Sequence, residues 1–428
     1  MTALSDGAVG AGGRRAIRGP GRAPLLVVHP GAELYGADRV LLESVAALAT
    51  RFTVTVALPH DGPLAAELGA RGVGVVLCPM PVLRNSALGP SGFLRLATDA
   101  VRGTFPALRL LRRYGVAGVY VSTVTVPSWP LLARLAGRRV ICPVHEAEQS
   151  RPRLLRRALA LAPFLSHLVV ANSRFTLDVL AEVAPRLRAR GTVVYNAVHG
   201  PAAVRPPRAQ LDGQLRLLFV GRLSPRKGPQ VAVATLAELV ARGVDARLEL
   251  VGSVFAGYEW FEAELRESVA GLGLADRVDF LGFRSDIWPH LADADVVLVP
   301  SVGEESFGNT AVEAVLAARP LVVSDSSGLR EAATGYASAQ LVDPGRPADW
   351  ADAVERLVAG WATFRLAAED DADRARRRHA AAGYAERLVG LVSRAGRLRG
   401  ESSASLEDGG AGDGSGAGPA GRSRTQFG

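Results

Sequence analysis

The sequence predicts an α/β fold built from two Rossmann-like domains, and three observations carry this prediction. Short runs of Val, Leu and Ala alternate along the chain with segments of helical periodicity, which is typical of βαβ units and a parallel sheet. The composition is 48% hydrophobic but only 6% aromatic, which suits strands that helices bury on both faces. A chain of 428 residues exceeds one ordinary core, so two domains are expected.

The strand candidates fall into two groups separated by a segment without apolar periodicity. The first group is residues 25–29, 53–58, 73–77, 118–122, 139–144, 167–171 and 192–195, and the second is residues 215–220, 247–251, 278–281, 296–299 and 321–323. The proline-containing segment between them reads as a linker. We therefore expect an N-terminal domain over residues 24–198, a linker over 199–213, a C-terminal domain over 214–349, and helices over 350–398 that pack back across the domains.

The two ends of the chain have compositions that do not support a folded core. Residues 1–23 are Gly-rich and basic and lack the apolar stretch of a secretory signal, and residues 399–428 are rich in Gly, Ser and Ala; both are expected to be disordered. No segment reaches the ~18 clean apolar residues of a membrane span. Cys78 and Cys142 lie in no metal or redox spacing. We expect a cytoplasmic protein and leave open whether it contacts a membrane peripherally.

The basic residues are almost all arginine. The net charge is +8, and Lys227 is the only lysine, a bias typical of a high-GC bacterial genome. Residues 84–157 contain thirteen arginines against Asp99, Glu146 and Glu148, a net charge of +10. Such a density suits an anionic membrane or a phosphate-bearing acceptor, although ordinary arginine-rich helix faces explain it equally well. Nucleic acid is not expected as a partner, because aromatic residues are not interleaved with the arginines.

The strongest chemical signal is the segment from Glu305 to Glu313, which follows an apolar strand ending near Pro300. If a helix begins near Gly308, Glu305 lies in the preceding loop and Glu313 lies about a turn and a half into the helix. The backbone N–H groups of Gly308, Asn309 and Thr310 would then form a helix N-terminus, which attracts phosphate. A solvated helix with two chance acids is the alternative.

A second signal is the loop from Gly221 to Gly228, directly after the first strand of the second domain. It places Arg222 and Lys227 at the carboxyl end of a strand, where open α/β sheets bind ligands, and two cations there can neutralise a diphosphate. The loop is neither a Walker A sequence nor the dinucleotide G-x-G-x-x-G sequence. A basic surface turn is the alternative.

With these motifs the chain resembles the retaining glycosyltransferases of family 4, which have the GT-B fold. The phosphate-binding Arg and Lys of that family match Arg222 and Lys227, its E-x7-E motif matches Glu305 and Glu313, and residues 320–331 match the strand and turn that follow. The resemblance implies two Rossmann-like domains facing each other across a cleft. It makes the N-terminal domain acceptor-binding and the C-terminal domain nucleotide-sugar-binding, with Glu313 on the ribose and Glu305 on the donor sugar.

The same resemblance assigns residues outside the two motifs. Gly36 matches the glycine loop that approaches the diphosphate, His145 matches a histidine that faces the donor sugar, and the backbone of Phe283 would lie by the nucleobase. A lone histidine is more often structural. Residues 172–174 and 195–196 also match family positions near the cleft, although Asn172 or Ser173 suits a helix cap as well. The catalytic candidates are His145, Arg222, Lys227 and Glu305. The donor-binding candidates are Gly36, Gly221, Phe283, Ser306, Phe307, Gly308, Asn309, Thr310 and Glu313.

No metal or cofactor is expected. Asp293 and Asp295 form a D-x-D pattern, but they precede a buried strand, far from the strand ends where phosphates gather, so a helix end and strand start is the better interpretation. Asp371 and Asp373 lie in a charged helical segment and are predicted to be solvated.

The predicted function is retaining, metal-independent transfer of a sugar from a nucleotide-diphosphate donor, most simply a UDP- or GDP-sugar. The acceptor would be a sugar, a lipid-linked molecule or a small molecule, in the biosynthesis of polysaccharide, glycolipid or glycosylated metabolites. A nucleotide-sugar epimerase of the same fold, or a non-catalytic sugar-nucleotide-binding module, remains an alternative.

Overall fold

The computed structural model describes residues 22–396, except residues 35, 84–89, 115–116, 148 and 256. These residues belong to one compact unit that ends at Gly396. The segments predicted to be disordered, residues 1–23 and 399–428, lie outside the described residues apart from residues 22 and 23. The predicted domain boundaries stay predictions, but the α/β class with two Rossmann-like halves is confirmed.

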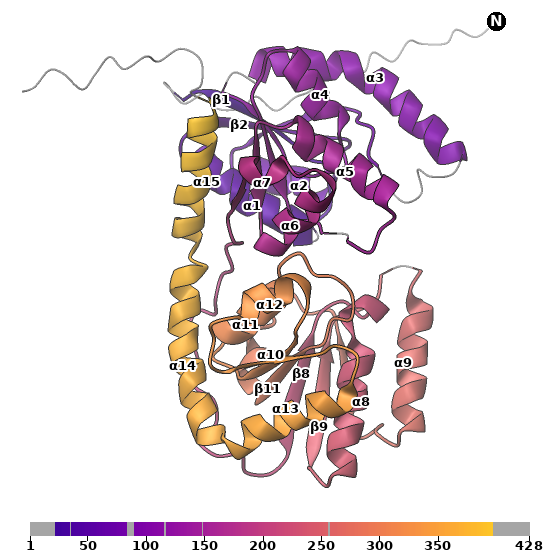
Figure 1. Cartoon of the computed structure of the whole chain (residues 1–428), viewed down its shortest axis with the longest axis vertical. Helices are drawn as coiled ribbons and strands as arrows, with labels where there is room; N and C mark the ends of the chain where they lie inside the picture. Colours follow the sequence, from indigo (N-terminus) through magenta and orange to yellow (C-terminus); the bar gives the residue numbers. More distant parts are fainter. Residues whose placement is uncertain are drawn as a thin grey trace, which may run out of the picture. The chain divides into compact units, whose positions relative to one another are not determined.

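The first half contains a seven-stranded, fully parallel sheet with the order β3-β2-β1-β4-β5-β6-β7 (Figure 1). Its strands are β1 (Pro24–Val28), β2 (Thr53–Leu58), β3 (Gly74–Leu77), β4 (Val119–Val121), β5 (Val140–Val144), β6 (Leu168–Ala171) and β7 (Gly191–Val193). The central strands are buried because Val, Leu and Ile occupy both of their faces.

Helices cover both faces of this sheet because the order in which strands are added reverses at β1. The connections before and after the reversal therefore lie on opposite faces. The helices are α1 (Gly36–Ala49), α2 (Pro63–Ala70), α3 (Pro90–Tyr114), α4 (Ser128–Leu135), α5 (Arg153–Leu165), α6 (Arg174–Val183) and α7 (Leu187–Arg190). Leu25 and Val27 of β1 belong to the core cluster of α1 and α2, whereas Leu26 and Val28 belong to the cluster of α3 and α4. This alternation is the two-residue period of a strand covered on both faces.

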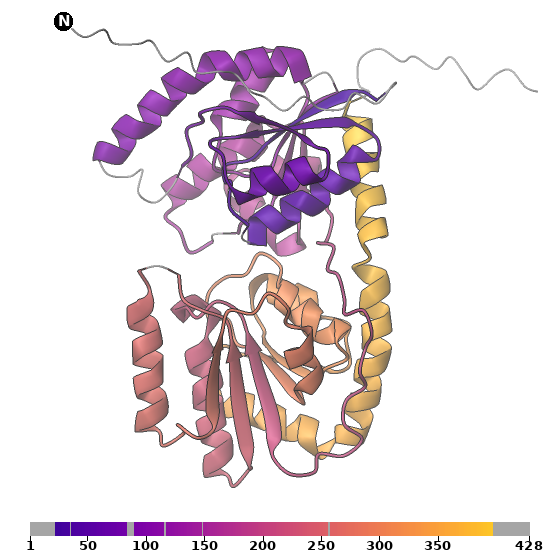
Figure 2. The same cartoon turned by 180° about the vertical axis from the view of Figure 1, so that it is seen from behind.

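The second half contains a six-stranded parallel sheet with the order β10-β9-β8-β11-β12-β13 (Figure 2). Its strands are β8 (Leu215–Val220), β9 (Ala246–Val251), β10 (Val278–Gly282), β11 (Val296–Val299), β12 (Leu321–Ser324) and β13 (Ala339–Val342). The sequence pattern did not predict β13, which lies at the edge of the sheet and carries the polar side chain of Gln340.

The second half contains a 3₁₀ turn and a series of helices, of which the last three end the described chain. These elements are the 3₁₀ turn η2 (Pro225–Lys227), α8 (Pro229–Ala241), α9 (Glu259–Gly271), α10 (Trp288–Asp293), α11 (Asn309–Leu316), α12 (Ser327–Ala333), α13 (Pro347–Ala359), α14 (Trp361–Arg378) and α15 (Ala381–Gly396). Helix α14 packs on α11 and α15 packs on α1, where the hydroxyls of Tyr384 and Ser44 are 2.7 Å apart. No helix in the described part of the chain combines the length and apolarity that a membrane crossing needs.

The prediction that Asp371 is solvated is wrong. Its side chain in α14 is fully buried and accepts hydrogen bonds from the backbone N–H and the hydroxyl of Ser338, each at 2.8 Å. Arg374 contributes an ion pair at 2.9 Å. Asp373 is exposed, as predicted. Asp371 is buried because its side of α14 faces the loop that leads into β13.

Candidate functional site

The strand order reverses once in each sheet, between β1 and β4 and between β8 and β11. In open α/β sheets, ligands bind in a crevice at such a reversal. The crevice forms because the loops that follow the two neighbouring strands run in opposite directions from the carboxyl ends of these strands. In the second sheet these loops begin at Gly221, after β8, and at Pro300, after β11. They contain both of the motifs that the sequence singled out.

A cavity of about 730 Å³ opens beside these loops. Five of the predicted residues line it: Gly221, Arg222, Phe283, Thr310 and Glu313. Other residues of its wall were not predicted from the sequence, among them Arg39, Phe255, Arg284 and Trp288. Because the wall combines cationic and aromatic side chains, it suits a ligand that carries both negative charge and a flat ring.

Arg222 is held at the cavity by an aromatic ring. Its guanidinium carbon lies 3.2 Å from the ring centroid of Phe255, in the loop after β9, an arrangement that favours a cation over a π face. This loop approaches the one after β8 so closely that a Cβ at Gly252 would lie 1.8 Å from the carbonyl oxygen of Gly221. The glycine, which also has a φ of +148°, therefore allows the two loops to meet.

Lys227 ends η2 and forms an ion pair with Glu305, with Nζ 2.9 Å from Oε1. The same carboxylate oxygen lies 2.7 Å from Nη1 of Arg226 and accepts a hydrogen bond from the hydroxyl of Ser301 at 3.3 Å. Gly228 makes this approach possible, because a Cβ there would lie 1.8 Å from the carbonyl oxygen of Pro300. The structure thus brings the two predicted motifs into direct contact.

Glu313 lies in the cavity wall, partly exposed. Burial raises its pKa from 4.5 to about 7, although the positive charges of Lys227 and Arg39 act in the opposite direction. Helix α11 begins at Asn309, so Glu313 is placed in its second turn, where the sequence predicted it. The side chain is therefore close to its protonation midpoint at neutral pH when no ligand is bound.

Three predicted donor-binding residues direct their side chains elsewhere. The hydroxyl oxygen of Ser306 accepts a hydrogen bond from Nδ2 of Asn172 at 3.1 Å. Oδ1 of Asn309 accepts one from Asn196 at 2.9 Å, and Phe307 is 1% exposed and stacks on Tyr195 with ring centroids 5.5 Å apart. These side chains join the second half of the chain to the first. Ser173 caps α6 by accepting a hydrogen bond from Thr176 N–H.

Gly308 is the point at which this segment changes direction. Its φ is +116°, and a Cβ there would lie 2.5 Å from Cδ2 of Leu329. Only glycine fits this backbone without strain. Its residue type is therefore set by the turn that precedes α11.

The candidates from the first half, Gly36 and His145, lie in loops or at element ends. Gly36 begins α1, between Leu34 and Arg39, both of which line the cavity. His145 follows β5, and its Nδ1 is buried with no hydrogen-bond partner among the described residues. Burial, with a smaller contribution from the neighbouring His29, lowers its pKa to about 4. The imidazole is therefore neutral at physiological pH.

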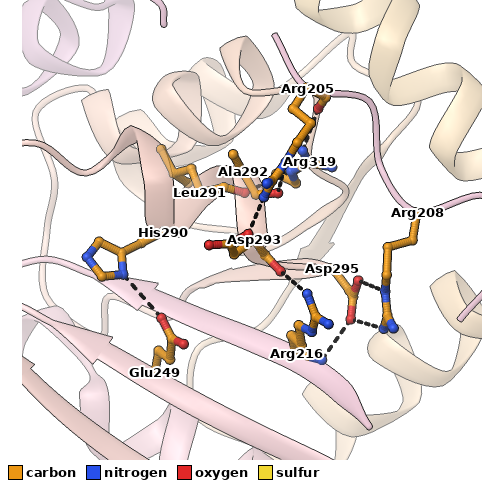
Figure 3. Close-up of polar contacts among 10 residues, drawn as sticks. All are labelled: Arg205, Arg208, Arg216, Glu249, His290, Leu291, Ala292, Asp293, Asp295 and Arg319. Atoms are coloured by element: carbon orange, nitrogen blue, oxygen red, sulfur yellow. Dashed lines mark hydrogen bonds and ion pairs between the residues drawn. The ribbon is translucent and has the colours of Figure 1, made fainter. Parts of the chain in front are cut away.

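The D-x-D pattern forms part of a cluster with several arginines (Figure 3), and neither of its aspartates lines the cavity. Asp293 ends α10 and pairs with Arg205. Asp295 is 1% exposed and accepts hydrogen bonds from Nε of Arg208 and from the backbone N–H of Arg216, each at 2.8 Å. Both carboxylates thus anchor the linker and β8. Within the described ranges, no three His, Cys, Asp or Glu side chains gather in a way that could hold a metal ion.

Two family descriptions match the chain, one in each half. Residues 35–199 match "Glycosyltransferase Family 4" and residues 214–360 match "Glycosyl transferases group 1". The chain belongs to the family 4 glycosyltransferases. The resemblance inferred from the sequence motifs is thereby confirmed.

Several curated relatives match about a third of the chain. A D-inositol 3-phosphate glycosyltransferase of Corynebacterium jeikeium is 41% identical over 145 residues, which are 33% of this chain and 34% of the relative. The chain spans about a third of the length of this and similar relatives. A 2-deoxystreptamine glucosyltransferase of Streptomyces kanamyceticus is 29% identical over 67% of this chain and 79% of its own length.

Solved structures match the whole fold. The crystal structure of Anabaena HepE in complex with UDP has a TM-score of 0.72 and 21% identity, covering 87% of this chain and 100% of that one. Its complex with UDP-glucose gives a TM-score of 0.71 at 22% identity, covering 86% and 99% of the two chains. At this identity the likeness establishes the fold, which is GT-B.

Proposed function

We propose that this glycosyltransferase moves a sugar from a nucleoside diphosphate to an acceptor hydroxyl, with retention of the anomeric configuration and without a metal ion. The observation that carries the proposal is the joining of the two motifs: Lys227 pairs with Glu305 beside a cavity that Arg222 and Glu313 line. Side chains that can bind a diphosphate thus lie next to a carboxylate that can bind hydroxyl groups. Both are placed where the strand order of the second sheet reverses.

Each part of the donor has a partner in this arrangement. Arg222, Lys227 and the N–H groups at the start of α11 would bind the diphosphate, because helix N-termini attract anions. Glu313 would accept hydrogen bonds from the ribose hydroxyls. Ser301, Arg226 and Lys227 all contact Oε1 of Glu305, so we assign its Oε2 to a hydroxyl of the donor sugar. Phe283, 66% exposed in the cavity wall, would lie beside the nucleobase.

The chemistry we propose needs no protein nucleophile. The acceptor hydroxyl would attack the anomeric carbon from the face that the diphosphate leaves, and a phosphate oxygen would take its proton. The chain would then contribute placement and charge stabilisation as negative charge builds on the leaving group, worth about 3 kcal/mol per well-placed donor. A neutral His145 is suited to accept or donate a hydrogen bond at the donor sugar. Gly36 would allow close approach of the backbone to the diphosphate.

A UDP-sugar is the first donor to test. HepE, which shares the fold, is solved with UDP and with UDP-glucose, and GDP- and ADP-sugars provide the comparison. A ligand that binds only the native state raises the melting temperature with its concentration, so a thermal-shift series ranks the donors. The acceptor would be a sugar, a lipid-linked molecule or a small molecule, and the product would belong to polysaccharide, glycolipid or glycosylated-metabolite biosynthesis.

The decisive test compares two charge-removing variants once donor and acceptor are known. Lys227→Ala should lose most of its kcat, by about 100-fold or more, while the chain stays folded, because Arg226 and Ser301 still contact Oε1 of Glu305. Arg346→Ala removes a cation whose side chain is 74% exposed in an ion pair with Asp349 and should turn over normally. Near-normal turnover by Lys227→Ala would refute the leaving-group role.

Two further measurements test the remaining parts of the proposal. Nuclear magnetic resonance of the product gives the anomeric configuration directly, and inversion would contradict the proposal. Dialysis against EDTA should leave turnover unchanged. Incubation of the enzyme with donor alone separates the transferase from an epimerase, because an epimerase would convert the free nucleotide sugar without an acceptor.

A further inference from the structure

Large apolar side chains are exposed on three successive helices of the first half. Eight of the seventeen large hydrophobic residues that are exposed in the described part of the chain lie on α3, α4 and α5. Helix α3 packs on α4 and α4 packs on α5, and the three follow one another beside the first sheet (Figures 1 and 2). Their exposed sides therefore adjoin. A group of exposed apolar side chains on adjoining helices is typical of an interaction surface.

Helix α3 has an apolar exposed side in addition to its buried side. Gly103, Ala107 and Leu111 are buried against the rest of the first half. Val101 and Phe105, one turn apart, are 79% and 71% exposed on the other side. At 100° per residue Leu94 falls on the same stripe. Packing among the residues that the structure describes does not account for these exposed side chains.

Helices α4 and α5 repeat this arrangement. In α5, Leu154, Leu161 and Phe164 are exposed with helical spacing, Leu154 by 79%. In α4, Leu131 and Leu135 are exposed one turn apart. Each helix thus presents a stripe of large apolar side chains to solvent.

Arginines flank these stripes, and acids are almost absent from them. Exposed arginines accompany the apolar side chains on all three helices: Arg102, Arg109, Arg112 and Arg113 on α3, Arg134 on α4, and Arg153 and Arg157 on α5. Across the three helices Asp99 is the only acidic residue, and it is partly buried. We call the exposed sides of α3, α4 and α5 the arginine-apolar face. It combines the two properties that a lipid interface selects.

An apolar hollow extends this face beside α5. It has a volume of about 390 Å³ and is lined by Leu161, Phe164 and Val183, with Arg157 and Arg186 also in its wall. A hollow of this kind can take an acyl chain while the guanidinium groups bind a phosphate above it.

We propose that the arginine-apolar face binds the surface of an anionic lipid bilayer, with its apolar side chains in the acyl boundary and its arginines on lipid phosphates. Charge complementarity selects this occupant. A second copy of the chain would bring arginine against arginine, and a nucleic acid would leave the Leu and Val side chains without partners. Membrane attachment goes beyond the proposed glycosyl transfer and would place the enzyme where a lipid-linked acceptor is found.

Vesicle sedimentation of the full chain tests the proposal without any enzymatic step. The chain should bind vesicles of phosphatidylcholine with 30% phosphatidylglycerol and bind pure phosphatidylcholine at least tenfold more weakly. Binding should weaken at 0.5 M salt, because the Debye length shortens. Since the assay needs neither donor nor acceptor, its failure is distinct from failure of the proposed transferase activity.

Two variants of the face separate its contributions. Arg102→Gln/Arg109→Gln/Arg112→Gln should lower partitioning into anionic vesicles about 100-fold, at roughly a factor of five per arginine. Val101→Ser/Phe105→Ser should lower it at least tenfold. Because these side chains are exposed, the melting temperature should stay within a few degrees of that of the unmodified chain.

A matched control removes exposed apolar side chains elsewhere. Trp260→Ser/Leu366→Ser replaces residues that are 50% and 53% exposed on α9 and α14, and its vesicle binding should equal that of the unmodified chain. The proposal is overturned if the unmodified chain does not bind anionic vesicles, or if the control weakens binding as much as the face variants do. The proposal would also be overturned if the arginine-apolar face bound a soluble protein and the chain showed no affinity for vesicles.

Discussion

Replacing Glu313 by glutamine should stabilise the enzyme while it weakens donor binding. The folded-state pKa of Glu313 is about 7 against an ordinary value of 4.5, because burial disfavours the charged form. The folded protein therefore binds more protons than the unfolded chain between these two values, and its free energy of unfolding falls as pH rises through that window. Glutamine cannot ionise, so Glu313→Gln escapes this loss.

The pKa shift sets the size of the effect. A shift of about 2.5 pKa units corresponds to about 3 kcal/mol at 1.36 kcal/mol per unit. Glu313 is partly exposed in the cavity wall, so solvent screening reduces this to about 1–2 kcal/mol. We expect Glu313→Gln to be more stable than the unmodified enzyme by that amount at pH 8, and by much less at pH 5, where both side chains are neutral.

Donor binding should change in the opposite direction. A carboxylate accepts hydrogen bonds from two hydroxyls more strongly than an amide does, so Glu313→Gln should bind the donor about tenfold more weakly at pH 8. In the unmodified enzyme, donor affinity should rise as pH increases through about 7, because Glu313 must ionise to accept both ribose hydroxyls. Lys227 and Arg39, whose charges favour the ionised form, make this ionisation accessible.

Urea unfolding at pH 5 and pH 8 measures the stability difference, and donor titration at the same two pH values measures affinity. Glu267→Gln on the exposed side of α9 is the matched control and should change neither. The reasoning is refuted if the stability gain of Glu313→Gln is the same at both pH values, since that gain would not come from ionisation.

Three further predictions follow from buried groups. Asp371→Ala should lower the free energy of unfolding by about 3 kcal/mol, because it leaves a buried N–H and hydroxyl unpaired; Asp373→Ala on the exposed side of α14 should change it by less than about 0.5 kcal/mol. Arg208→Ala should cost about 3–5 kcal/mol by leaving Asp295 buried without its ion pair, as urea unfolding would show. Because the pKa of His145 lies near 4 through burial, His145→Gln should lower kcat/KM without changing the shape of its profile between pH 6 and 8; a lost inflection near 6.5 would contradict this.

The strands were predictable because a strand that is buried on both faces has an unbroken run of apolar residues. Residues 25–28 and 296–299 are unbroken apolar runs, and each forms a central strand. The edge strand β13 is buried on fewer sides, so its sequence Ala-Gln-Leu-Val lacks such a run. Fold class follows from the central strands, which is why missing one edge strand did not alter it.

The sequences of the helices were less informative about which side of each helix is buried. The charged composition of α14 predicted solvent exposure for Asp371, yet the loop before β13 covers that side of the helix. Local sequence does not reveal which side of a helix a distant loop covers. The same limit hid Arg39, which lies in the first turns of α1 and lines the cavity together with Glu313.

The motif from Glu305 to Glu313 was recognisable from sequence, but the division of its side chains was not. Before Gly308, Ser306 and Phe307 contact the first half of the chain; after it, Thr310 and Glu313 line the cavity. Asn309, directly after Gly308, still contacts the first half through Asn196, and the cavity-lining residues begin at Thr310. Because a helix start leaves N–H groups for an anion whichever way its side chains point, the anion-binding potential was readable from sequence alone. The side-chain contacts depend on what lies opposite, and only the folded chain supplies that.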